Sequence, residues 1–125
     1  MSYNLSLRSR QRLSGVNPLL VDVVKRAIEI TKQDFSVTEG VRNINRQKEL
    51  VNSGASKTMN SRHLTGHAVD LVPYPVSWDW EYFYPIAEAM KQAAEDLGVD
   101  IEWGGDWKSF PDGPHFQLSW EKYPK

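Results

Sequence analysis

The sequence predicts an α+β fold in which a small antiparallel sheet packs against helices. Two stretches, residues 17–32 and 79–97, repeat apolar side chains at the spacing of one helical face. Four short runs rich in β-branched, aromatic and other apolar residues are typical of strands. Helices and strands do not alternate regularly along the chain, as they would around a parallel sheet, and this favours the α+β class.

The chain begins with two predicted helices. Residues 6–13 can form a short one. Asn17 followed by Pro18 is a favourable start for the second, because asparagine caps the first turn and proline fits the first helical position. We expect this helix to continue to about Lys32. Its apolar face consists of Leu20, Val23, Val24, Ala27 and Ile28.

A strand and a third helix are expected next. Residues 35–38 alternate between apolar and polar side chains, which predicts a strand. Either Asn43 or Asn45 can cap a helix that reaches about Asn52. Gly54 suits the position just past the end of that helix, where the backbone often turns left-handed.

The middle of the chain predicts a loop, a strand and a long helix. Residues 55–61 are small and polar, so we expect a loop there. Residues 68–72 form an apolar run typical of a buried strand. Prolines then interrupt the chain, and a helix begins near Asp79, or at Pro85 at the latest. Gly98 is expected to end it.

Two more strands complete the predicted sheet. Residues 99–103 and 115–118 are the candidates, and the glycine-rich segment 104–106 between them predicts a turn. The whole chain, residues 1–125, has the size of a single domain.

Composition excludes several classes of function. The net charge of −1 argues against a nucleic-acid-binding surface. The chain has no apolar run near the ~20 residues that span a membrane, so we expect no membrane insertion. The polar, basic N-terminus lacks the apolar core of a signal peptide. With no cysteine, a metal site must use His, Asp or Glu.

Two short motifs predict a zinc site. Asp70 lies within an apolar strand, where a carboxylate is costly to bury without a partner. His63 precedes it by seven residues, and His115 belongs to a second motif near the C-terminus. Three ligands leave a fourth position for water, which is the pattern of a catalytic zinc site. The alternative is a buried, hydrogen-bonded pair of His63 and Asp70 without metal.

His67 has a different predicted role. It follows His63 at the i, i+4 spacing of a helical zinc pair. However, no glutamate follows His63, and Gly66 together with the strand-like residues 68–72 argues against a helix. We therefore place His67 beside the metal ligands or on the substrate side, not among the ligands.

The motifs resemble those of a known family. Residues 61–70, SRHLTGHAVD, resemble the S-x-H-x-x-G-x-A-x-D signature of peptidoglycan metallopeptidases that include D-alanyl-D-alanine carboxypeptidases and dipeptidases. Residues 112–115 are similar to their second motif, and residues 39–47 to an upstream segment. Residues 103–107, WGGDW, resemble one branch, the phage L-alanyl-D-glutamate endopeptidases. The match covers residues 35–118.

The resemblance implies roles for further residues. It identifies Asp112 as the general base that takes a proton from the attacking water and returns it to the leaving amine. The carboxypeptidase and dipeptidase branches have Glu at this position, and Asp is typical of the phage branch. Arg42 is expected to stabilise the developing oxyanion. Val41 replaces the usual aromatic residue before Arg42. The implied fold is the one shared with hedgehog signalling domains.

Several candidate residues have two interpretations. Asp112 can instead be a turn residue and Arg42 a surface arginine. Ser61 is expected to be a hydrogen-bonding support, because no triad accompanies it. Asp106 either shapes the site or simply packs, as do Trp103 and Trp107. The tryptophans either belong to the core, which we favour, or line an open groove for a peptide or carbohydrate-bearing ligand. Four of the five lie close in sequence: Trp78, Trp80, Trp103 and Trp107.

The predicted function is that of a zinc-dependent, monomeric peptidoglycan endopeptidase that cleaves the L-Ala–D-Glu bond, as phage or prophage endolysins do. We expect synthesis in the host cytoplasm, release through a phage-made pore, and no separate wall-binding domain. One alternative is a D,D-carboxypeptidase of the same family, although such enzymes normally carry an export signal. Another is a non-catalytic, zinc-stabilised binding domain, which the presence of Asp112 and of an open ligand position argues against.

Overall fold

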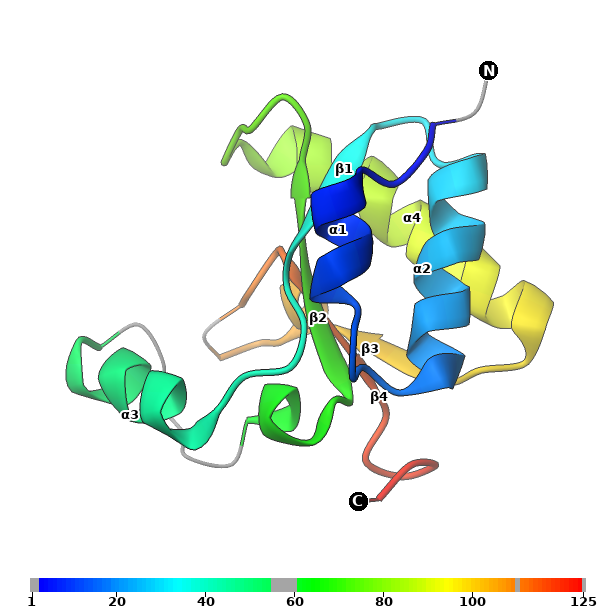
Figure 1. Ribbon diagram of the computed structural model, residues 1–125. Coiled ribbons are helices and arrows are strands. Elements are labelled where there is room, and N and C mark those ends of the chain that lie inside the picture. The colour runs from blue at the N-terminus through cyan, green and yellow to red at the C-terminus, as the bar shows by residue number, and fades with distance from the viewer. Residues whose placement is uncertain (1–2, 55–60, 110, 125) are drawn as a thin grey trace.

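A four-stranded antiparallel sheet with strand order β1-β2-β4-β3 forms the centre of the computed structural model, which describes residues 3–54, 61–109 and 111–124 (Figure 1). The strands are β1 (Phe35–Glu39), β2 (Ala68–Pro73), β3 (Ile101–Trp103) and β4 (His115–Leu118). All neighbouring strands pair antiparallel, so the predicted α+β fold is confirmed.

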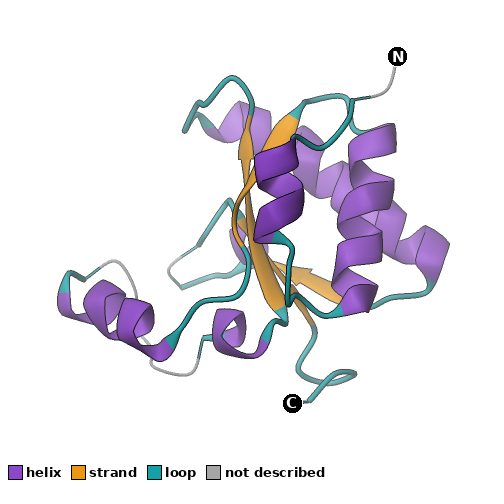
Figure 2. Ribbon diagram, in the orientation of Figure 1, coloured by secondary structure: helices purple, strands orange, loops and turns teal. Residues whose placement is uncertain are grey.

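The helices divide between two sides of the sheet (Figures 1 and 2). α1 (Leu7–Arg12), α2 (Pro18–Ile30) and α4 (Trp80–Leu97) pack together against the sheet, while α3 (Ile44–Asn52) lies apart from them. The apolar faces of α2 and α4 meet the sheet in one hydrophobic core. Because strand side chains alternate, Val69, Leu71, Phe116 and Leu118 enter this core, and their neighbours face the opposite side.

The helix starts are confirmed by their caps. The side chain of Asn17 accepts a hydrogen bond from the Leu19 N–H, with Pro18 as the first helical residue of α2. For α3 the cap is Asn43, not Asn45, and its side chain accepts from the Arg46 N–H. Asp79 occupies the capping position of α4, so the earlier of the two predicted starts is correct.

The element ends differ slightly from the prediction. α2 ends at Ile30, because Thr31 already has an extended backbone with ψ of 144°. α4 ends at Leu97 and is terminated by Gly98, as predicted, with a left-handed φ of 70°. The Val99 N–H bonds back to the Ala94 carbonyl oxygen, so β3 begins at Ile101 and not at residue 99.

The described residues form two short 3₁₀ helices, one of them at the turn that was predicted for residues 104–106. Arg62–Thr65 forms the turn before β2, and Gly104–Asp106 forms the turn after β3. Residues 55–60 of the predicted loop lie outside the described part of the chain. Within the described part, every helix is too short or too polar to cross a membrane.

Candidate active site

His63, Asp70 and His115 form a cluster on the face of the sheet away from the core. One ligand atom from each lies within 4.8 Å of the others, so the three can hold a metal ion. Asp70 on β2 is paired directly with His115 on β4, which places the two side chains together. His63 comes from the 3₁₀ turn Arg62–Thr65. The cluster therefore depends on strand pairing and on one tight turn.

Gly66 allows this turn to enter β2. Its φ is 77°, in the left-handed region that favours glycine. A Cβ atom at this position would also lie 2.7 Å from the Gly15 carbonyl oxygen. A larger residue would thus strain the backbone and displace the loop before α2, and either change would move His63 relative to Asp70.

The inner nitrogens of both histidines face Asp70. His63 Nε2 lies 3.2 Å and His115 Nδ1 lies 3.4 Å from Asp70 Oδ1. The outer nitrogens have other partners: His63 Nδ1 lies 2.8 Å from the Gly40 carbonyl oxygen, and His115 Nε2 lies 2.8 Å from Gln117 Oε1. Because these oxygens can only accept hydrogen bonds, they favour N–H on the outer nitrogens and free lone pairs on the inner ones when a metal is bound. This is how metal-binding histidines are usually oriented.

Charge interactions in the cluster favour a cation. Burial acts to raise the pKa of Asp70, but before a metal ion binds, the hydrogen bonds and positive charges of protonated His115 and His63 outweigh it and hold that pKa well below its usual range. Burial acts to lower the pKa of His115, and the hydrogen bond and charge of Asp70 more than reverse this, so its pKa is raised. Asp70 therefore stays ionised although its side chain is only 20% exposed, and the donor set of two imidazoles and one carboxylate suits Zn²⁺.

Arg42 lies beside Asp70 and is itself held firmly. Its Nε and Nη2 donate to the two carboxylate oxygens of Glu39 at 2.8 and 2.7 Å, and its Nη1 donates to Gln47 Oε1 at 2.8 Å. The remaining contacts are longer: Nη1 lies 3.5 Å from Ser61 Oγ, and Nη2 lies 3.7 Å from Asp70 Oδ2. The guanidinium is buried, not a surface group.

Ser61 connects Arg42 to the metal-binding histidine. Its Oγ caps the 3₁₀ turn by accepting from the His63 N–H at 3.2 Å, and the same oxygen contacts Arg42. The Arg42 N–H in turn donates to the His63 carbonyl oxygen at 2.9 Å. These contacts agree with the supporting role expected for Ser61.

Asp112 reaches the cluster from the loop before β4. Burial and the negative charge of Asp70 raise its pKa, while the positive charges of His115, His63 and Arg42 act in the opposite direction. Its backbone is fixed by a hydrogen bond from its N–H to the Gly104 carbonyl oxygen. A Cβ atom at Gly104 would lie 2.4 Å from the Asp112 carbonyl oxygen, so glycine is needed for this close packing. A carboxylate with a raised pKa is suited to accept a proton.

The family model of the phage L-alanyl-D-glutamate peptidases matches residues 1–118. The chain belongs to this family. The resemblance inferred from its motifs, including the assignment to the phage branch, is confirmed.

Individual relatives agree with this assignment. The L-alanyl-D-glutamate peptidase of Escherichia phage T5 is 32% identical over 119 residues, which cover 90% of this chain and 87% of the relative. The peptidase of the same name from Listeria phage A118 is 40% identical over 88 residues, 70% of this chain and 31% of the relative. The peptidoglycan L-alanyl-D-glutamate endopeptidase CwlK of Bacillus subtilis is 31% identical, covering 84% of this chain and 74% of the relative.

A solved structure shows the same fold. The crystal structure of the Serratia marcescens L-Ala D-Glu endopeptidase ChiX superposes with a TM-score of 0.93 at 48% sequence identity. The match covers 99% of this chain and 96% of ChiX.

The remaining candidate residues of this family member lie around the cluster in different ways. The Trp107 ring lies 5.1 Å from the His115 ring, beside the site. Trp103 is buried, stacks on Phe116 and donates from Nε1 to the Gly113 carbonyl oxygen, so it packs behind the loop that carries Asp112. Asp106 is exposed and forms an ion pair with Lys91 at 2.8 Å. Only Trp103 among the five tryptophans belongs to the core, so the core interpretation holds for one of them.

Three supporting residues had no predicted role. Glu39 and Gln47 hold Arg42, and Gln117 bonds His115. Gln117 is held in turn by Glu102, whose Oε1 accepts from the Gln117 amide at 3.4 Å. Glu39 and Gln47 lie in the segment 39–47 that resembles the upstream motif of the family, and Glu39 precedes Arg42 by three residues, so the sequence held signals for both contacts of Arg42.

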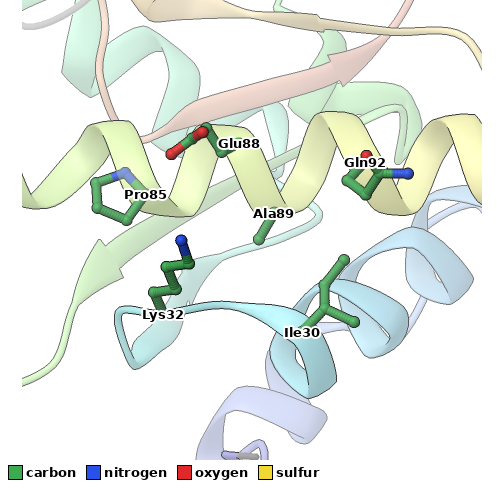
Figure 3. Close-up of a pocket in the computed structure, with 6 residues that line it drawn as sticks. All are labelled: Ile30, Lys32, Pro85, Glu88, Ala89 and Gln92. Carbon is green, nitrogen blue, oxygen red and sulfur yellow. The ribbon is translucent and has the colours of Figure 1, made fainter.

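A separate hollow between the end of α2 and α4 contains none of these residues (Figure 3). Its lining consists of Ile30, Lys32, Pro85, Glu88, Ala89 and Gln92. The site of interest is therefore the cluster on the open face of the sheet, not this hollow.

His67 lies outside the three-residue cluster, and this leads to a prediction. Its Nδ1 lies 2.6 Å from Thr65 Oγ1, and burial together with the charge of Arg62 lowers its pKa. We expect His67→Ala to keep the zinc content of the wild type, measured by elemental analysis of the purified protein. Loss of zinc in a variant with an unchanged circular dichroism spectrum would show that His67 belongs to the ligand set and that the choice of His63 over His67 was wrong.

Proposed function

We propose that this protein is a zinc endopeptidase that hydrolyses the L-Ala–D-Glu bond of the peptidoglycan stem peptide. The observation that carries the proposal is the cluster of His63, Asp70 and His115, with a proton acceptor, Asp112, and a cation, Arg42, beside it. The names of the relatives support the bond and the substrate, and two of these relatives come from phages. We extend the proposal to the role of an endolysin, which cuts the peptidoglycan of the host cell and so lyses it.

Three of the chain's donors would hold the zinc ion: His63 Nε2, a carboxylate oxygen of Asp70 and His115 Nδ1. Three protein ligands are the number found in catalytic zinc sites, whereas structural sites use four. When bound, zinc acts as a Lewis acid toward the scissile carbonyl and makes water a stronger nucleophile near neutral pH. The bonds from Gly40 and Gln117 to the outer nitrogens keep both imidazoles in the orientation that this requires.

Asp112 would move the proton. It accepts a proton from the attacking water and returns it to the amine of D-Glu as the peptide bond breaks. Its raised pKa supports this role, because a carboxylate that binds a proton more readily than usual is a better base. Asp112 is not among the three proposed zinc donors, so we expect its loss to separate catalysis from metal binding.

Arg42 would stabilise the negative charge that develops on the carbonyl oxygen. The guanidinium has five N–H groups, and three of them make short bonds to Glu39 and Gln47. Among the described residues, the other two make only the longer contacts to Ser61 and Asp70, so they are available to donate to a substrate oxygen while the short bonds hold Arg42 in place.

Cleavage-site analysis tests the proposal. We expect digestion of purified, cross-linked peptidoglycan to release peptides with a new N-terminal D-Glu, identified by mass spectrometry, without accumulation of free D-Ala. Enzyme treated with a chelator is the control. Release of D-Ala with the L-Ala–D-Glu bond intact would indicate a D,D-carboxypeptidase. Absence of any product from zinc-loaded protein would indicate a binding domain.

A further inference from the structure

Three aromatic side chains are exposed together at the start of α4. Trp78, Trp80 and Tyr84, which we call the aromatic cluster, have exposed fractions of 66%, 43% and 54%. Exposed apolar residues are common when scattered singly, but a contiguous group marks an interaction surface.

The aromatic cluster is supported from below by buried rings. Trp78 stacks on Phe83 with ring centroids 6.1 Å apart, and Trp80 contacts Phe83 at 6.3 Å. Trp80 and Tyr84 contact each other at 6.2 Å, and both rest against the buried Trp103. These contacts fix the exposed rings in one arrangement, and preorganised rings bind a ligand without first having to be ordered.

The aromatic cluster continues from the proposed active site. Gly113 follows Asp112 directly, and its carbonyl oxygen accepts the hydrogen bond from Trp103. A Cβ atom at Gly113 would lie 3.4 Å from the Phe83 ring and 3.5 Å from the Trp80 ring. One short loop thus carries the proposed base and packs against the aromatic cluster. In Figure 1 this loop and the segment before α4 both project on the side away from α1 and α2.

The chemistry of the proposed substrate indicates what this surface contacts. In peptidoglycan, L-Ala is joined by an amide bond to the lactyl group of N-acetylmuramic acid. A cut after L-Ala therefore leaves a single residue between the cleaved bond and the sugar. The protein surface on the amino side of the cleaved bond must face the glycan strand.

We propose that the aromatic cluster binds the glycan strand, N-acetylmuramic acid with its neighbouring N-acetylglucosamine, on the amino side of the cleaved bond. The inference rests on the proposed function. Pyranose rings have apolar C–H faces that stack on aromatic rings, and their hydroxyl groups need polar partners at the rim. The rim supplies the exposed carboxylates of Asp79 and Glu81 and the hydroxyl of Tyr84.

The charge around the aromatic cluster favours a sugar over a bilayer. Tryptophan and tyrosine also gather where proteins contact membranes, but such surfaces carry lysine and arginine that attract anionic lipids. Lys91, farther along α4, lies 5.1 Å from the centre of the Trp103 ring, but its charge is paired with Asp106. The ionisable residues at the start of α4 itself are Asp79 and Glu81, both exposed and acidic. They would be repelled by an anionic bilayer and can accept hydrogen bonds from sugar hydroxyls.

A binding experiment tests the inference without any cleavage. Glycan strands freed of peptide are titrated into the zinc-loaded protein, and the indole N–H signals are followed by NMR. We expect saturable shifts of the Trp78 and Trp80 signals, and about tenfold weaker binding for Trp78→Ala, as expected for loss of one aromatic contact. Tyr82→Ala is the matched control, because Tyr82 lies in the same turn, is 39% exposed and points about 200° around the helix from Trp80.

A kinetic experiment links the aromatic cluster to the substrate. The ratio of kcat/KM for a muropeptide to kcat/KM for the same peptide without sugar is measured. We expect a ratio above one for the wild type and a ratio about tenfold lower for Trp78→Ala and for Trp80→Ala. Trp80→Ala loses packing on Trp103 and can lower the melting temperature. In that case the result for Trp78→Ala alone decides the test.

Defined outcomes would overturn the inference. The inference is wrong if glycan does not shift the indole signals, or if Tyr82→Ala weakens binding as much as Trp78→Ala does. It is also wrong if the wild type has the same kcat/KM for the muropeptide and for the peptide without sugar. Binding to phosphatidylglycerol vesicles that depends on Trp78, without any response to glycan, would show a membrane contact instead. If no substrate is cut at L-Ala–D-Glu, the proposed function fails, and the glycan titration still decides whether the aromatic cluster binds sugar.

Discussion

His115→Ala should lose zinc and lytic activity together. The substitution removes one of three donors and leaves the carboxylate of Asp70 without the partner that lies 3.4 Å from it. The remaining His63 and Asp70 cannot complete a catalytic site. We expect zinc to fall from about one ion per chain to near zero, and lysis of purified walls to fall to the level of chelator-treated wild type. His63→Ala should behave in the same way.

Elemental analysis and a turbidity assay measure the two effects side by side. Zinc added back after chelation should restore the wild type and neither variant. His67→Ala is the matched control, because it makes the same substitution at the third histidine of the chain. Full zinc occupancy in either His63→Ala or His115→Ala would remove that residue from the ligand set.

Asp112→Asn should separate catalysis from metal binding. The amide has nearly the same shape as the carboxylate but cannot accept the proton of the attacking water. The backbone bond from residue 112 to Gly104 does not involve the side chain, so the loop should keep its position. We expect unchanged zinc content and melting temperature, with kcat lower by the ~10²–10⁴-fold that a general base contributes.

The measurement is the rate of stem-peptide cleavage at saturating substrate and full zinc occupancy. Asp100→Asn, at an exposed carboxylate just before β3, controls for the loss of one negative charge. Turnover near the wild-type level in Asp112→Asn would exclude Asp112 as the base. Glu102 would then be the next candidate, because it bonds Gln117 behind His115.

Local signals in the sequence were sufficient for the elements. Asn17 with Pro18 and Asn43 start α2 and α3, and Gly98 ends α4, because caps act through hydrogen bonds and backbone angles within one turn. The apolar run around Asp70 likewise predicted strand β2, but not that its carboxylate faces away from the core. Exact ends were less predictable: β3 begins two residues late, because Val99 bonds back to α4.

The sequence by itself determined the family, the fold class and the three donors proposed to hold zinc, because motif spacing and strand alternation are local properties of the chain. Only the tertiary structure decided what surrounds those donors. The bonds of Gly40 to His63 and of Gln47 to Arg42 depend on how β1, the turn before β2 and α3 come together. The core position that we favoured for the tryptophans holds for Trp103 but is wrong for the exposed Trp78 and Trp80, because burial depends on which segments pack above a side chain, and composition does not contain that information.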